Sequence, residues 1–250
     1  MNSITEYLTF NGYTYRINIY FPGNKKPEHE SYPVLYVLDG DKYGVLLREI
    51  VKLQSHRTSK TGVGPYIIVS IELTEEITKR RYFDFTRENK EGNAAEVNQI
   101  SYPVGGAYQF NEFLQNEVKQ LVSHVLNDTP QKEVLFGHSL TAYYGLHLLE
   151  SKPELFTDYI LLSPSVWWNQ QEALDYDFSK IEQTQTKIYI AAGEQEAKLV
   201  TGVQKLKSEL SHYKNVRVQI FENENHASII PTAISSGSVS YTHLTLPTIY

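Results

Sequence analysis

"VLFGHSLTAYYG", residues Val134 to Gly145, begins as an apolar run typical of a buried strand and continues as a helix rich in small and apolar residues. Gly137 and Ser139 match the first two defined positions of the G-x-S-x-G pattern, and Thr141 stands where the last glycine belongs. Such an elbow exposes the serine side chain above the sheet edge and points the next amide at an oxyanion site. The alternative interpretation is a serine whose side chain caps the helix.

Apolar segments of strand length lie on both sides of this stretch and alternate with amphipathic helical patterns. The hairpin signal at Asn11–Tyr13 joins the first two strands, and helices are predicted over 107–126 and 199–213. We therefore predict an α/β fold with a doubly wound, mostly parallel eight-stranded sheet that starts with an antiparallel hairpin. The strand segments are SITEYLTF, YTYRINIYF, PVLYVLD, YIIVSIE, EVLFG, YILLSP, KIYIAAG and VRVQIFE. Ser55–Gly64 and Thr78–Gly106 are predicted as long loops.

Composition excludes several classes of function. The net charge of −6 and scattered basic residues disfavour nucleic-acid binding. The chain has no apolar run long enough to span a membrane and no signal-peptide pattern at its start, so we expect no membrane contact and a cytoplasmic protein. Zero cysteines exclude disulfides, thiolate metal sites and a cysteine nucleophile. No spacing indicates a metal site or a cofactor, so serine, histidine and carboxylates must supply the chemistry.

The C-terminus is interpreted separately. VSYTHLTLPT, residues Val239 to Thr248, looks like the translation of a sequencing adapter. We therefore expect a single α/β domain over 1–237, with its last helix truncated, and an artefact tail over 238–250.

Chain order supports a catalytic interpretation of Ser139. Hydrolases with this elbow take an acid from the loop after the seventh strand and a histidine from the loop after the eighth. The segment GEQE after KIYIAA offers Glu194 and Glu196, and NENH after VRVQIFE offers His226. The other histidines, including His138, are expected to be surface or packing residues.

Several segments together resemble one known family. The chain contains VLFGHSL, ELFTDYILLSPSVWWN, IYIAAGEQE and FENENHAS, with LYVLDGD and RRYFDFTREN closer to the N-terminus. With this spacing, residues Ile4 to Gly237 resemble the Putative esterase (esterase D-like) family of α/β-hydrolases, the branch that contains bacterial siderophore esterases of the enterobactin and bacillibactin type. That family usually has two glycines where this chain has Thr141 and Ala142.

The resemblance assigns roles to particular residues. It favours Glu196 over Glu194 as the triad acid, because Glu196 lies three residues after the glycine of that segment. It places one oxyanion donor at the amide of Asp41, which follows Gly40. The other donor is expected at the amide of Leu140, directly after the nucleophile.

Two further positions are candidates for substrate binding. Trp167 or Trp168 is expected to stack on an aromatic acyl group, or else to pack at the rim of the site. Arg81, with Arg80, is expected to meet an anionic substrate. The alternatives for both arginines are an ion pair with Asp84 or Glu88, or a charge exposed to solvent.

We therefore predict a serine carboxylic-ester hydrolase that acts through Ser139, His226 and Glu196 and an acyl-enzyme, with a small-molecule ester, and a siderophore lactone in particular, as substrate. An acyltransferase or a serine peptidase on the same triad remains an alternative, as does a non-catalytic binding module in which Thr141 has spoiled the elbow. The sequence gives no indication of the oligomeric state.

Overall fold

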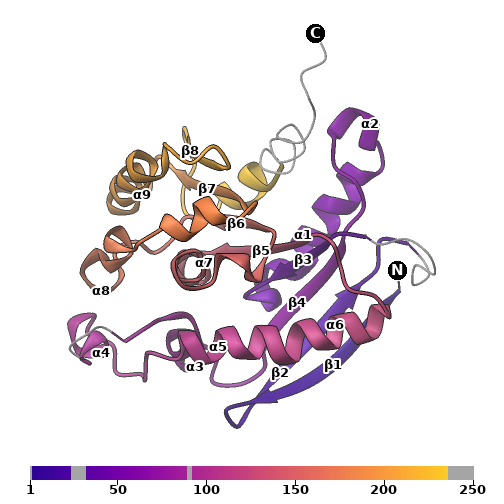
Figure 1. The fold of residues 1–250 in the computed structure, drawn as a ribbon, viewed down its shortest axis with the longest axis horizontal. Helices are drawn as coiled ribbons and strands as arrows, with labels where there is room; N and C mark the ends of the chain where they lie inside the picture. Colours follow the sequence, from indigo (N-terminus) through magenta and orange to yellow (C-terminus); the bar gives the residue numbers. More distant parts are fainter. Residues whose placement is uncertain (1, 24–31, 89–91, 236–250) are drawn as a thin grey trace.

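The structure is a computed structural model that describes residues 2–23, 32–88 and 92–235. Within them, one eight-stranded sheet has the order β1-β2-β4-β3-β5-β6-β7-β8 (Figure 1). The strands are β1 Ser3–Phe10, β2 Tyr13–Tyr20, β3 Val34–Val37, β4 Ile67–Leu73, β5 Glu133–His138, β6 Asp158–Leu162, β7 Lys187–Gly193 and β8 Val216–Phe221.

The pairing confirms the predicted sheet. Strands β1 and β2 form an antiparallel hairpin, and β2 also pairs antiparallel with β4. All pairs from β4 through β3, β5, β6 and β7 to β8 are parallel. The turn of the hairpin has Asn11 at φ 50° and Gly12 at φ 78°, the two positive φ angles that a tight hairpin turn requires.

Helices cover both faces of the sheet (Figure 1). The larger core packs α3, α5, α6, α7 and α9 on one face, and the smaller core packs α1 and the helical residues 229–235 on the other. The helices are α1 Gly40–Ser55, α2 Thr58–Thr61, α3 Ile77–Phe85, α4 Ala94–Val97, α5 Ala107–Phe113, η1 Leu114–Val118, α6 Lys119–Leu126, α7 Leu140–Ser151, η2 Pro153–Leu155, α8 Trp168–Gln171, η3 Glu172–Asp175, η4 Ser179–Gln183 and α9 Ala197–Leu210.

Helix boundaries refine the sequence-based expectations. The predicted helix over 107–126 is one continuous rod in which η1 forms a single π-helical turn between α5 and α6. The two predicted loops were partly wrong, because α2 lies in the first, while α3 and α4 lie in the second. Helix α3 has little apolar periodicity, since its buried side chains are Arg80, Asp84 and Phe85.

The predicted artefact tail over 238–250 lies outside the described residues, as do residues 236 and 237. The single-domain boundary at residue 237 therefore stays a prediction. Up to residue 235, the chain continues as the helix that begins at residue 229, and Ile229, Ile230 and Ile234 are buried against the sheet.

Candidate active site

Ser139 lies on a sharp turn between β5 and α7. Its backbone has φ 61° and ψ −116°, a conformation that is strained for a residue with a side chain. Gly137 makes the turn possible, because a Cβ there would lie 2.5 Å from the carbonyl oxygen of Thr141. The Ser139 side chain makes no capping hydrogen bond to α7, and its Oγ lies instead 3.3 Å from Ser165 Oγ. The helix-cap interpretation of this side chain is therefore wrong.

Thr141 fits the elbow at the position where the pattern has a glycine. Its side chain is fully buried, and Oγ1 accepts a hydrogen bond from the His138 amide at 2.8 Å while donating to the His138 carbonyl oxygen at 2.9 Å. The hydroxyl thus satisfies two backbone groups on the strand side of the turn.

Glu196 and His226 lie together at the adjoining strand ends. Glu196 Oε2 is 2.5 Å from His226 Nδ1, while Oε1 accepts hydrogen bonds from Ser163 Oγ at 2.6 Å and from the Gly193 amide at 2.7 Å. Burial opposes ionisation of Glu196, but the hydrogen bonds from His226, Ser163 and Gly193 outweigh it and lower the pKa of this carboxyl group. The Glu196 side chain is 5% exposed and that of His226 is 49% exposed, so the pair presents its imidazole to the surface.

Glu194 points elsewhere, although it lies on the same loop. Its Oε2 accepts a hydrogen bond from the backbone amide of Asn223 at 3.2 Å, at an exposed position. The structure therefore brings Glu196 to the His226 side chain. It places Glu194 against the backbone at Asn223, in the loop after β8 that also carries His226.

His138 connects the elbow to the loop that carries His226. Its Nε2 lies 2.9 Å from the carbonyl oxygen of His226, and its Nδ1 lies 2.9 Å from the hydroxyl of Tyr43. The ring centroids of His138 and His226 are 4.4 Å apart. In the described part of the chain no hydrogen bond joins Ser139 Oγ to the His226 ring, a geometry common in free hydrolases, whose catalytic hydrogen bonds tighten when substrate binds.

Both predicted oxyanion donors lie at helix N-termini. Leu140 is the first residue of α7 and Asp41 is the second residue of α1, positions whose amides have no acceptor within their own helix. The α1 terminus approaches the sheet closely at Gly40, where a Cβ would lie 2.2 Å from Ser70 Oγ. Asp39 precedes this terminus at φ 50°, and its carbonyl oxygen accepts hydrogen bonds from Lys42 and Tyr43.

Arg81 pairs with Asp39. Its Nε and Nη2 donate to the two carboxylate oxygens of Asp39 at 2.6 and 2.7 Å, and the Asp39 side chain is 1% exposed. The expected alternative partners of Arg81 were therefore wrong. Arg80 does pair with Asp84 as one alternative predicted, and it also donates to Tyr15 Oη at 2.8 Å. A substrate contact of Arg81 stays a prediction.

The two tryptophans have different environments. Trp167 is 47% exposed, whereas Trp168 is fully buried and stacks on Tyr82 with ring centroids 5.7 Å apart. Tyr82 in turn stacks on Tyr102 at 6.1 Å. Trp167 follows Ser165 by two residues, so it is the tryptophan of the pair that is both accessible and close in sequence to the Ser139 partner.

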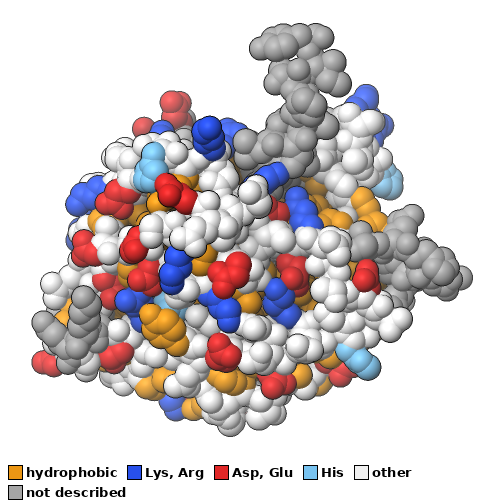
Figure 2. Space-filling model, viewed as in Figure 1, with side chains coloured by type: hydrophobic (Ala, Val, Ile, Leu, Met, Phe, Trp, Pro, Cys, Tyr) orange, Lys and Arg blue, Asp and Glu red, His pale blue; other side chains and the backbone are white. Residues whose placement is uncertain are grey.

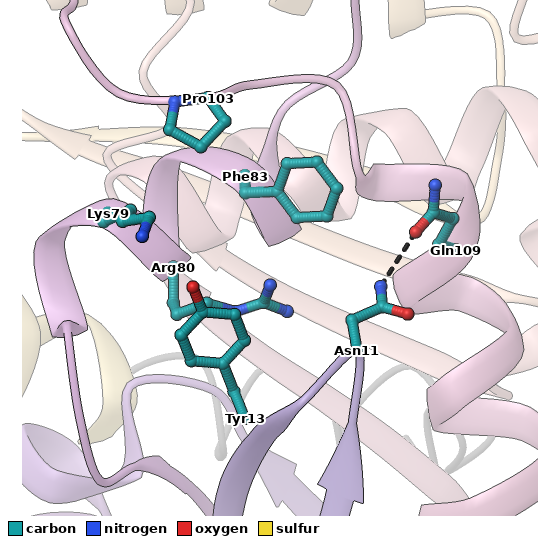
Figure 3. A pocket seen from close by; sticks show the side chains of 7 residues that line it. All are labelled: Asn11, Tyr13, Lys79, Arg80, Phe83, Pro103 and Gln109. Atoms are coloured by element: carbon teal, nitrogen blue, oxygen red, sulfur yellow. Dashed lines mark hydrogen bonds between the residues drawn. The ribbon is translucent and has the colours of Figure 1, made fainter.

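A cavity of about 270 Å³ opens beside the β1–β2 turn and is separate from this site (Figure 3). Its two cations are already paired, Lys79 with Glu76 and Arg80 with Asp84. The cavity is lined by Asn11, Tyr13, Lys79, Arg80, Phe83, Pro103 and Gln109.

On the face shown in Figure 2, acidic and basic side chains are interspersed.

Sequence reasoning missed four contributors to the site: Tyr43, His138, Ser163 and Ser165. The available signal was position, because His138 directly precedes the elbow serine and the two serines follow the sixth strand. Among the described residues, no group of three or more His, Cys, Asp or Glu side chains is arranged to hold a metal ion, and no helix has the length and apolar character needed to cross a membrane.

Comparison with known proteins identifies the family. The family model described as Putative esterase matches residues 11–228. The chain is 30% identical to the ferri-bacillibactin esterase BesA of Bacillus subtilis (strain 168) over 239 residues, covering 89% of this chain and 82% of that protein. It is 27% identical to a siderophore triacetylfusarinine C esterase of Aspergillus fumigatus, covering 63% of this chain and 53% of that protein.

A solved structure has the same architecture. The BES protein from Bacillus cereus superposes with a TM-score of 0.82 at 30% identity, covering 95% of this chain and 94% of that one. The family match, the sheet topology and the elbow at Ser139 lead to one conclusion. This chain has the α/β-hydrolase fold, belongs to the Putative esterase family and is an esterase.

Proposed function

We propose that the chain hydrolyses carboxylic esters through a triad of Ser139, His226 and Glu196. The observation that carries the proposal is the 2.5 Å contact between Glu196 Oε2 and His226 Nδ1, on the loops that follow β7 and β8, beside an elbow that presents Ser139. A buried carboxylate on Nδ1 keeps the proton there and leaves Nε2 free to act as a base.

The reaction has two steps. His226 Nε2 takes the proton from Ser139 Oγ as the oxygen attacks the ester carbonyl, and the resulting imidazolium gives that proton to the leaving alcohol. The acyl-enzyme is then hydrolysed by water, whose proton passes to the same Nε2 and on to Ser139 Oγ. Ser165 Oγ, 3.3 Å from Ser139 Oγ, holds the nucleophile in the free enzyme.

The oxyanion of the tetrahedral intermediate is bound by the amides of Leu140 and Asp41. Each such donor contributes about 3 kcal/mol to lowering the barrier, provided it is held in place before the reaction. The salt bridge of Arg81 to Asp39 supports this requirement, because it fixes the residue two positions before the Asp41 amide. We also propose that Arg81, whose side chain is 20% exposed, contacts an anionic group of a bound substrate.

The substrate is proposed to be a siderophore ester. The relatives described above are named as esterases of ferri-bacillibactin and of triacetylfusarinine C. The exposed Trp167, two residues after Ser165 in the sequence, supports this proposal, because an indole face can stack on an aromatic acyl group. Replacing Trp167 by Ala should then raise KM for an aryl ester more than for an alkyl ester of similar size.

The test compares wild type with Ser139→Ala. Wild type should label with a fluorophosphonate probe and hydrolyse an aryl ester, and it should hydrolyse a catecholate trilactone with a higher kcat/KM than the simple ester. Ser139→Ala should lose the label and about 10⁴–10⁶-fold in turnover. A folded wild type that neither labels nor turns over would exclude the esterase mechanism and favour a binding module.

A further inference from the structure

His138 and Tyr43 form a connected pair that the triad does not use. Tyr43 lies in the first turn of α1, His138 is the last residue of β5, and His226 lies after β8. One hydrogen bond joins Tyr43 Oη to His138 Nδ1 and a second joins His138 Nε2 to the carbonyl oxygen of His226, each at 2.9 Å. Three segments far apart in sequence are therefore tied together through one imidazole.

The direction of both hydrogen bonds follows from the acceptor at one end. A carbonyl oxygen can only accept, so His138 Nε2 must carry a proton and donate it to His226. Burial, and then the nearby His226, lower the pKa of His138 to about 4, so the ring is neutral at neutral pH. Nδ1 of a neutral Nε2–H imidazole is an acceptor, and the Tyr43 hydroxyl must donate to it.

Each group around His138 is accounted for. The side chain is 3% exposed, and Tyr43 packs edge-on against it with ring centroids 5.4 Å apart. The hydrogen bond to the His226 carbonyl oxygen and the acidic groups of Glu196 and Asp39 favour a proton on this ring, whereas the charge of the His226 side chain disfavours it. The neutral form also keeps a second positive charge away from His226, which becomes an imidazolium during the reaction.

We propose that His138, oriented by Tyr43, is a positioning residue that holds the backbone of the His226 loop so that the imidazole reaches Ser139. This inference rests on the proposed function of His226 as the base. The His226 side chain is 49% exposed, and among the described residues its ring makes one side-chain hydrogen bond, to Glu196. The carbonyl contact of His138 supplies a second anchor, on the backbone of the same residue.

The test uses two substitutions at His138. Phenylalanine fills the buried space and has no donor, whereas glutamine places an amide donor near the former Nε2. His138→Phe should lower kcat about 10–100-fold, the cost of a base misplaced by roughly 1 Å, with KM changed less than about twofold. His138→Gln should recover most of that loss.

Tyr43→Phe removes only the hydroxyl. It should lower kcat about threefold in the wild-type background and have no further effect in His138→Phe, because both changes interrupt the same connection. In nitrogen NMR spectra of the wild type at pH 7, His138 should be the Nε2–H tautomer, and Tyr43→Phe should shift its Nδ1 resonance.

The chain offers a matched control on α7. His147 is also a buried imidazole, with Nε2 3.2 Å from Asn111 Nδ2, and the Tyr144 hydroxyl donates to Asn111 Oδ1 at 2.6 Å. His147→Phe and Tyr144→Phe remove comparable buried groups away from the His226 loop. Measured on the folded fraction, these variants should keep kcat within about twofold.

Two results would overturn the inference while leaving the proposed triad intact. One is Ser139-dependent turnover that is equal in His138→Phe, His138→Gln and wild type. The other is an Nδ1–H tautomer for His138, since the ring then could not donate to the His226 carbonyl. A wild type without Ser139-dependent turnover would instead refute the triad, and this inference with it.

Discussion

Replacing Glu196 by glutamine tests the triad most directly, because the surrounding donors dictate how the new amide must lie. The Gly193 amide donates to Oε1 at 2.7 Å and cannot reverse its role. The glutamine oxygen must therefore face Gly193, and its NH₂ group must face His226 Nδ1. Nδ1 then becomes an acceptor, the ring proton moves to Nε2, and the imidazole can no longer take a proton from Ser139.

The magnitude follows from the fraction of histidine left in the productive tautomer. In serine hydrolases an equivalent change of carboxylate to amide lowers kcat by about 10⁴, and we expect about 10³–10⁴-fold here, equivalent to about 4–5.5 kcal/mol of barrier. The assay is steady-state hydrolysis of a chromogenic aryl ester, with the rate of fluorophosphonate labelling as a second measure of nucleophile reactivity. Both rates should fall together in Glu196→Gln.

Glu194→Gln is the matched control. Glu194 lies two residues away on the same loop, and its carboxylate accepts a hydrogen bond from the Asn223 amide, a role that the oxygen of a glutamine can keep. Its kcat should stay within about twofold of wild type. An equal loss in the two variants, or a loss below about tenfold in Glu196→Gln, would refute the assignment of the acid.

Three further outcomes are expected. Thr141→Val leaves the buried His138 amide and carbonyl without their partner and should lower the free energy of unfolding by about 1–3 kcal/mol in denaturant titration. Thr141→Ser keeps the hydroxyl and loses only a buried methyl group, so it should be the more stable of the two variants. Equal stability of the two variants would contradict the hydrogen bonding described. Gly137→Ala places a Cβ 2.5 Å from a backbone oxygen and should cost about 1–3 kcal/mol together with a loss of turnover, so a stable, active variant would contradict the geometry of the elbow. Burial, and secondarily the charge of Arg87, lower the pKa of His147 from 6.5 to about 3. As the pH falls below 6.5, the His147 imidazole therefore takes up a proton in the unfolded chain but not in the folded one, and the free energy of unfolding decreases. Relative to His147→Gln, wild type should lose about 1.4 kcal/mol per pH unit between pH 6 and 4, and parallel pH profiles of the two proteins would exclude this contribution.

Local patterns were enough to predict the sheet and the elbow. Buried parallel strands are continuous apolar runs, and chain order places Ser139, the acidic loop and His226 at the same edge of the sheet. Glu196 and Glu194 could not be separated by such patterns, because both lie on one loop. The choice depends on the Gly193 amide and on Ser163, which reaches the loop from the neighbouring strand.

Features that depend on buried polar side chains were not predictable from apolar periodicity or from nearness in sequence. Helix α3 buries a pair of Arg80 and Asp84 in place of apolar side chains, so its sequence lacks the periodicity by which helices are identified. The partner of Arg81 is Asp39, 42 positions away, and no local rule selects it over nearer acids. His138 was expected to be a surface or packing residue, and no local pattern reveals its two partners, because they come from other elements.

The Arg81–Asp39 salt bridge has a mechanical consequence. It fastens α3, which also carries Tyr82 of the stacked aromatic rings, to the turn that presents the Asp41 amide. On the proposed mechanism, a bulky substrate that displaces α3 would also displace the Asp41 amide, because the Arg81–Asp39 ion pair joins the two. The proposed oxyanion role of Asp41 would then link accommodation of a bulky acyl group to stabilisation of its transition state, so selection for a wider pocket would act on catalytic rate as well as on fit.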